Sequence, residues 1–184
     1  MKTLIFNGSP RKNGDTVSLI NEFVRNIEGE VKLVNAYSCD IKPCVDCRFC
    51  WEQEGCCQKD GMQEIYDYIN ECDTIVIASP IYFAELSGQL LAILSRLQAI
   101  FCASYFRKVK PILRDKKGII ILVGGGEGPM KKASETATTL LHQMYVQNIY
   151  PAIFSYNTNL TPSKDDMEAM NKVKELALLC NAER

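Results

Sequence analysis

The chain has 184 residues, of which 47% are hydrophobic, enough for one sizeable core and few for two. Lysine and arginine together number 21 and aspartate and glutamate 22, so the chain lacks the basic excess of a general nucleic-acid binder. It has no apolar run of about 18 residues and no charged-then-apolar leader at its start. We therefore expect one domain spanning residues 1–184, located in the cytoplasm, that acts on a small ligand or a protein and not on nucleic acid or a membrane.

Strand-like and helix-like patterns alternate along the whole chain. The predicted strands are 3–7, 31–37, 74–79, 119–124 and 149–155, and the predicted helices are 16–27, 62–71, 86–100, 129–147 and 163–180. The inner strands are nearly continuous apolar runs, as parallel strands covered on both faces require. The pattern predicts an α/β fold with a doubly wound, five-stranded parallel sheet and helices on both faces. Ligands of such sheets bind beyond the carboxyl ends of the strands.

The connection between the first predicted strand and helix, residues 7–16, reads Asn-Gly-Ser-Pro-Arg-Lys-Asn-Gly-Asp-Thr. The first turn of a helix leaves N–H groups unpaired and carries partial positive charge, which suits an anion. Gly8 and Gly14 allow close approach of the backbone, and Arg11 can bond to phosphate oxygens. The loop lacks the dinucleotide pattern Gly-x-Gly-x-x-Gly and a Walker A ending. It therefore predicts a mononucleotide phosphate site, with an ordinary capped turn as the alternative.

The next long connection, residues 38–61, contains a run of cysteines. Cys44, Cys47 and Cys50 are followed by Cys56 or Cys57, a spacing that resembles the compact ligand run of ferredoxins. Zinc sites usually use two Cys-x-x-Cys pairs separated by a longer insert, so the compact run favours iron; zinc and free thiols are the alternatives. The cysteines outside the run are interpreted as small apolar residues: Cys39, Cys72, Cys102 and Cys180.

Two later strands end in unusual connections. Residues 79–83 read Ser-Pro-Ile-Tyr-Phe, which can frame a flat heteroaromatic ring. Residues 124–129 read Gly-Gly-Gly-Glu-Gly-Pro, which leaves room for a ligand before a helix starts. We expect both connections to meet the first loop at the carboxyl edge of the sheet.

Four segments together resemble the flavodoxin-like NAD(P)H-dependent FMN reductases, in the branch that contains the iron-sulfur flavoproteins. They are Gly-Ser-Pro-Arg-Lys-Asn-Gly-Asp-Thr (8–16), Ser-Pro-Ile-Tyr-Phe (79–83), Leu-Ser-Gly-Gln-Leu (86–90) and Arg96-Leu97. The resemblance implies strand order 2-1-3-4-5 and bound FMN. It places the phosphate at Ser9, Arg11, Asn13, Asp15 and Thr16. It places the flavin along Pro80, Ile81, Tyr82 and Phe83, with Gly125, Gly126, Glu127 and Gly128 near the ring.

The same resemblance implies a four-iron [4Fe-4S] cluster in the cysteine run. Its ligands would be Cys44, Cys47, Cys50 and Cys56, because Lys59, Asp60 and Met62 then keep the family's spacing to the next helix. Relatives commonly carry asparagine or serine at the position of Asp15. Since a carboxylate repels phosphate, we expect Asp15 to cap its own helix and face the N–H groups there.

The implied function is that of an FMN-dependent oxidoreductase. It takes hydride from NAD(P)H, or electrons from a small carrier protein, and passes them to an acceptor. Flavin N5 does the chemistry, so no catalytic side chain is assigned. The resemblance also implies a homodimer or homotetramer, with helix 86–100 as a contact surface. The alternatives are a flavin electron carrier or thiol redox sensor without a substrate, and a zinc-stabilised interaction module.

Two further features have simpler interpretations. His142, the only histidine, is interpreted as a packing or surface residue and not as a catalytic base. A basic stretch is interpreted as a solvated loop, with contact to the 2′-phosphate of NADPH or to an acidic electron carrier as the alternative; it comprises Lys108, Lys110, Arg114, Lys116 and Lys117.

Overall fold

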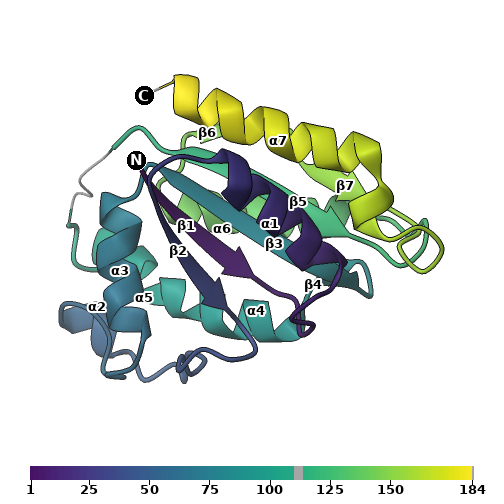
Figure 1. The fold of residues 1–184 in the computed structure, drawn as a ribbon. Coiled ribbons are helices and arrows are strands. Elements are labelled where there is room, and N and C mark those ends of the chain that lie inside the picture. Colours follow the sequence, from purple (N-terminus) through teal and green to yellow (C-terminus); the bar gives the residue numbers. More distant parts are fainter. Residues whose placement is uncertain (110–113, 184) are drawn as a thin grey trace.

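The computed structural model describes residues 1–109 and 114–183, and Lys110 of the basic stretch lies outside them. Its centre is a parallel sheet that lies between two layers of helices (Figure 1). The long strands run in the order β2 (Glu30–Asn35), β1 (Lys2–Asn7), β3 (Thr74–Tyr82) and β5 (Lys117–Val123). Two short strands, β6 (Asn148–Ile149) and β7 (Ile153–Ser155), both pair in parallel with β5. The predicted fold class is confirmed.

The sheet is apolar because both of its faces are covered. On one face, α1 (Asp15–Asn26) and α7 (Met167–Ala182) enclose a core cluster that includes Phe23 and Val173. The other face carries α3 (Met62–Glu71), α4 (Gly88–Leu94), α5 (Gln98–Tyr105) and α6 (Lys131–Gln143). Of the residues in β1, β3 and β5, the inner ones are buried almost completely, which explains their unbroken apolar runs.

The predicted helix 86–100 is wrong in detail, because the chain first makes a tight hairpin. Phe83 and Ala84 both have positive φ, 52° and 62°, and the turn that they form pairs β4 (Glu85–Leu86) antiparallel to the end of β3. The helical chain then runs through α4, a 3₁₀ turn η1 (Ser95–Leu97) and α5.

The predicted fifth strand, 149–155, is interrupted between β6 and β7. Pro151 lies in the gap and has no N–H to donate to β5, so the pairing stops and resumes at Ile153. The short helix α2 (Phe49–Glu52), inside the cysteine run, was not predicted from the sequence, and the predicted helix 163–180 is divided into the 3₁₀ turn η2 (Ser163–Asp165) and α7. Among the helices of the described residues, none combines the length and the apolar character needed to cross a membrane.

Candidate functional site

An open pocket lies at the carboxyl edge of the sheet, where four connections meet. It is lined by the loop after β1 and the first residues of α1, by the ends of β3 and β5, and by the loops after β5 and β7: Ser9, Pro10, Arg11, Gly14, Asp15, Thr16, Pro80, Ile81, Tyr82, Val123, Gly125, Thr158 and Asn159. The three loops singled out in the sequence therefore converge, as expected. Parallel strands deliver their C-terminal loops to one edge, which is why segments more than a hundred residues apart meet there.

The N-terminus of α1 faces this pocket with its backbone donors available. Gly14 is the N-cap, and it makes no side-chain hydrogen bond to the first turn. The first-turn N–H groups of a 12-residue helix can thus serve a bound anion. The loop before the helix is held by its own bonds: Ser9 N–H donates to Asn7 Oδ1 at 2.9 Å, and Arg11 N–H donates to Ser9 Oγ at 3.2 Å.

Gly8 is packed too tightly for any larger residue. A Cβ there would lie 2.8 Å from Ser87 Oγ and 2.9 Å from both Leu90 Cδ2 and Ser79 Oγ. Ser79 Oγ in turn accepts a 3.0 Å hydrogen bond from the N–H of Ser87. The loop between β1 and α1 is therefore packed closely against the start of α4.

Asp15 does not cap its own helix, so that prediction is wrong. Its Oδ1 accepts a 2.8 Å hydrogen bond from the N–H of Ser163, at the start of η2. The carboxylate thus accepts from a backbone N–H at the start of η2 and not from one of its own helix, because η2 packs against α1. Asp15 nevertheless lines the pocket.

The loop after β7 was missed in the sequence, although it completes the pocket. Backbone N–H groups of Asn157, Thr158 and Asn159 donate to the carbonyls of residues 126, 124 and 125 at 3.3, 3.1 and 3.3 Å. This ladder fastens the glycine loop, and a Cβ on Gly125 would lie 2.8 Å from Asn159 Nδ2. The polar run Asn-Thr-Asn, one residue after the last strand, was the available signal.

Some of the residues expected around the ligand are not in the pocket lining. Asn13 is exposed beside it, and Gly126, Glu127 and Gly128 are exposed on the far part of the glycine loop. Glu127 accepts a 3.0 Å hydrogen bond from Asn157 Nδ2. Phe83 is fully exposed at the tip of the β3–β4 hairpin.

A second pocket gathers the thiols of the cysteine run. Cys44, Cys47, Cys50 and Cys56 all line it, together with Cys102 of α5. The interpretation of Cys102 as merely a small apolar residue is thus incomplete, since its neighbours in space are the sulfurs of the run. Cys57 is exposed and outside the lining. In residues 1–109 and 114–183, no three His, Cys, Asp or Glu side chains are grouped so as to hold a metal ion.

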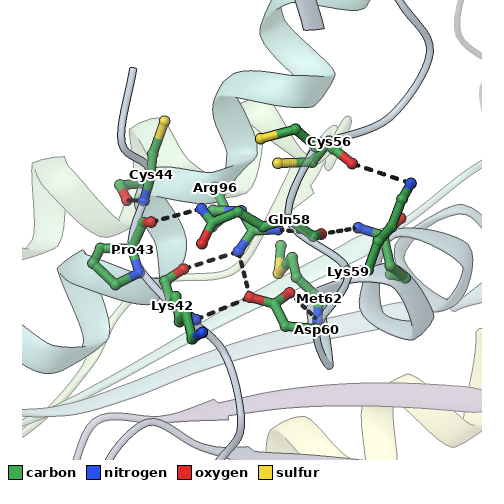
Figure 2. Close-up of polar contacts among 12 residues, drawn as sticks. Lys42, Pro43, Cys44, Cys56, Gln58, Lys59, Asp60, Met62 and Arg96 are labelled. Atoms are coloured by element: carbon green, nitrogen blue, oxygen red, sulfur yellow. Dashed lines mark hydrogen bonds and ion pairs between the residues drawn. The ribbon is translucent and has the colours of Figure 1, made fainter. Parts of the chain in front are cut away.

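Arg96 clamps both arms of the cysteine run (Figure 2). Its Nη1 donates to Lys42 O at 2.9 Å and to Asp60 Oδ2 at 2.7 Å, and Nη2 donates to Gln58 O at 3.3 Å. Lys42 precedes the first cysteine of the run and Gln58 follows the last, so one guanidinium closes the loop at its base. The Arg96 side chain is 0% exposed and that of Asp60 is 6% exposed.

Arg96 also lines the thiol pocket, and its Nε has no hydrogen-bond partner among the described residues. A buried, unsatisfied cationic donor beside thiols suits an anionic metal–thiolate group. Two further contacts hold the run: Cys44 N–H donates to Ser95 Oγ at 2.9 Å, and Arg107 Nε donates to Cys50 O at 3.2 Å. Trp51 of α2 stacks on Phe106 at 4.2 Å between ring centroids.

The thiols differ in their electrostatics. Burial and a hydrogen-bond contact with the Cys102 thiol raise the pKa of Cys50 to about 12. The contact with Cys47 raises the pKa of Cys57 to about 11, while the backbone N–H of Phe49 lowers the pKa of Cys47 from its usual value. The thiolate form is therefore favoured at Cys47 and disfavoured at Cys50 and Cys57.

Within the described part of the chain, the two pockets share no lining residue. They are linked by α4, whose N-cap Ser87 bonds to Ser79, the residue before Pro80 of the first pocket, and whose C-cap Ser95 bonds to Cys44 of the second. A helix of this length places its ends about 12 Å apart.

The interpretation of the basic stretch as a solvated loop is wrong for Lys116 and Lys117, whereas Arg114 is exposed. Lys116 is 0% exposed and its Nζ donates to Met144 O at 3.4 Å. Lys117 Nζ donates to the carbonyls of Cys180 and Glu183, at 3.1 and 2.6 Å, and Arg114 pairs with Asp73. His142 is a surface residue near the end of α6, and its Nδ1 lies 3.1 Å from Val146 O.

Solved structures share this fold. An FMN-dependent NADH-azoreductase from Bacillus anthracis, in complex with FMN, superposes with a TM-score of 0.67 at 17% identity, covering 96% of this chain and 98% of that one. An NADH:FMN oxidoreductase in its apo form gives a TM-score of 0.64 at 18% identity, covering 97% and 88%. These likenesses confirm the flavodoxin-like architecture.

Relatives found by sequence share a higher identity with this chain than these two structures do. An iron-sulfur flavoprotein of Archaeoglobus fulgidus is 27% identical over 179 residues, which cover 96% of this chain and 77% of the relative. One of Methanosarcina thermophila is 26% identical over 181 residues, which cover 96% and 92%. The model of the family described as NADPH-dependent FMN reductase matches residues 1–159. The chain therefore belongs to the NADPH-dependent FMN reductase family and is an FMN-dependent NAD(P)H oxidoreductase, as its resemblance implied.

Proposed function

We propose that the pocket at the carboxyl edge of the sheet is the FMN site of this oxidoreductase. The observation that carries the proposal is the convergence of the end of β3 and the loops after β1, β5 and β7 on that one pocket. When bound, FMN supplies the hydride and electron chemistry through its flavin ring. The chain's own residues then have to bind, orient and surround it.

The phosphate is assigned to the loop before α1 on the basis of its donors. The N–H groups of the first turn, the hydroxyls of Ser9 and Thr16 and the guanidinium of Arg11 surround that end of the pocket. The ring is assigned to the other end, where Pro80, Ile81 and Tyr82 offer apolar and aromatic surface and Gly125 adds none of its own. Tyr82 is 45% exposed, so this end is open to a second molecule such as the nicotinamide.

The cysteine run is proposed to hold an iron–sulfur cluster on Cys44, Cys47, Cys50 and Cys56. Support comes from their shared pocket, from the exclusion of Cys57 from that pocket, and from the unpartnered Nε of Arg96. When bound, such a cluster passes electrons one at a time. The names of the sequence relatives support the same assignment.

We also propose a homodimer or homotetramer. The contact surface is shifted from helix 86–100 to its continuation, since Leu90, Ile93 and Leu94 of α4 are buried in their own core. Phe101 and Tyr105 of α5 are 39% and 58% exposed and stack on each other at 5.2 Å. An assembly would cover this aromatic surface, and a monomeric mass by light scattering on FMN-loaded protein would refute it.

The test is an absorbance spectrum with iron and sulfide assays on protein purified without oxygen. Flavin bands, a broad shoulder and about four irons per chain are expected. The Cys44→Ser variant should lose the iron and keep the flavin, whereas Cys39→Ser, outside the thiol pocket, should keep both. No flavin after addition of FMN would refute the proposed flavin site.

Steady-state oxidation of NADH and NADPH by the loaded protein is the second test. Turnover with either nucleotide is expected of the oxidoreductase. A flavin-loaded protein that oxidises neither would favour the alternative of an electron carrier served by a protein donor.

A further inference from the structure

Two exposed thiols of the cysteine run lie directly against each other. The sulfurs of Cys47 and Cys57 are 3.2 Å apart, and both side chains are exposed. Cys56, the immediate neighbour of Cys57, is buried and lines the thiol pocket. The two adjacent cysteines therefore face different surroundings, one toward the pocket and one toward solvent and Cys47.

The local backbone allows this pair to close. A disulfide needs its sulfurs about 2.05 Å apart, so an approach of roughly 1 Å is required. The segment between the two residues contains α2, which is a single helical turn, and Gly55. Gly55 has a φ of +77°, and a Cβ there would meet nothing within 4 Å. Neither cysteine belongs to a strand or a helix that the movement would break.

We propose that Cys47 and Cys57 form a reversible disulfide when the cysteine run holds no metal, with a hydroperoxide as the oxidant. The sulfur of Cys47 attacks one peroxide oxygen, the O–O bond breaks, and the products are a sulfenic acid and a molecule of water or alcohol. The sulfur of Cys57 then attacks the sulfenic sulfur, forming the S–S bond and releasing water. Two electrons pass from the thiols to the peroxide, and a dithiol reductant reverses the reaction by exchange.

The disulfide and the proposed cluster exclude each other, and this part of the inference rests on the proposed function. Cys47 lines the thiol pocket as well as contacting Cys57, so its sulfur can bond either to metal or to Cys57. Oxidation of the metal-free run would thus block its reloading until a reductant restores Cys47.

The experiment uses the full chain, stripped of metal with a chelator under reducing conditions and then treated with hydrogen peroxide. Remaining thiols are alkylated and the protein is digested with trypsin. Cleavage after Arg48 puts Cys47 and Cys57 on different peptides. The expected product is a linked pair of these peptides that disappears after treatment with dithiothreitol, with fragmentation placing the bond at Cys47 and Cys57.

Matched variants decide the assignment. Cys57→Ser should abolish the linked pair and Cys56→Ser should retain it. A wild-type map without the linked pair, or a pair that survives in Cys57→Ser, would overturn the proposal. Because the map is made on metal-free protein, it decides the disulfide independently of whether the reconstituted chain takes up iron, which tests the cluster.

Discussion

Replacement of Arg96 by methionine is the most informative perturbation of the cysteine run. Methionine keeps much of the length and apolar stem of arginine and removes the guanidinium. The substitution breaks the 2.7 Å ion pair with Asp60 and the bonds to Lys42 O and Gln58 O. We expect both a less stable protein and a cysteine run that no longer holds its thiols together.

The magnitude follows from burial. Both partners are almost inaccessible, at 0% and 6% side-chain exposure. Breaking a buried pair by removing one partner typically costs about 3–5 kcal/mol, because the other charge stays buried without compensation. Asp60 keeps two donors, the N–H groups of Lys42 and Met62 at 3.0 and 3.1 Å, which favours the lower end of that range. The loss is still a large share of the about 5–15 kcal/mol that usually stabilises a domain.

Urea unfolding at fixed FMN concentration measures the effect, with Arg25→Met as the matched control. Arg25 forms an exposed pair with Glu22, three residues away on α1, and its loss should cost less than about 0.5 kcal/mol. An Arg96→Met cost equal to that of the control would refute the clamp. Iron content after anaerobic reconstitution is the second measurement, and it should fall in Arg96→Met and not in Arg25→Met.

The pH dependence gives an independent check. Burial raises the pKa of Asp60, but the hydrogen bonds from Arg96, Lys42 and Met62 outweigh it, so the pKa lies below its usual value. An acid with a lowered folded pKa contributes stability above its unfolded pKa of about 3.9, and that contribution is lost as the pH falls through the folded value. The stability difference between wild type and Arg96→Met should therefore shrink below about pH 4.

Three further predictions concern other parts of the chain. Gly8→Ala should weaken FMN binding by about tenfold or more in a fluorescence titration, since overpacking costs about 1–3 kcal/mol, while Gly88→Ala, where a Cβ meets nothing within 4 Å, should not. Asp15→Asn should tighten FMN binding a few-fold in the same titration, because it removes a negative charge and keeps the oxygen that accepts from Ser163; weaker binding would contradict this. Lys116→Met should raise the free energy of unfolding by about 1–2 kcal/mol at neutral pH. Burial lowers the pKa of Lys116, so this advantage should diminish as the pH rises toward about 10.4, and a variant less stable than wild type in urea would contradict the reasoning.

The alternation of strands and helices was readable from the sequence because buried parallel strands leave long apolar runs. The hairpin at Phe83 and Ala84 was not, because positive φ in residues other than glycine has no clear sequence signal. The break in the predicted fifth strand did have a sequence signal, because Pro151 cannot donate a hydrogen bond to β5.

The sequence predicted those parts of the site whose residues are neighbours along the chain, and it missed the parts whose residues meet only in the fold. The loop at residues 8–16 and the cysteine run are continuous in the chain, so spacing and residue type indicated them. Arg96 and Asp60 are 36 residues apart, and Cys102 reaches the thiol pocket from α5. A single arginine within an otherwise uncharged, mostly apolar helical stretch was the signal for the clamp, because a buried charge requires a partner.

The contacts of Arg96 at the base of the cysteine run have a consequence for metal loading. They order the run when the protein folds, and not when metal binds. Closing a flexible loop of this length costs about 2.5 kcal/mol. Here Arg96 closes it during folding of the sheet and helices, from contacts that include no thiol. Small metallo-domains that fold only with their metal pay this ordering cost at the moment of binding. This chain would instead present a cysteine run that is already closed at its base, so that metal can be loaded after folding and lost again without unfolding the protein.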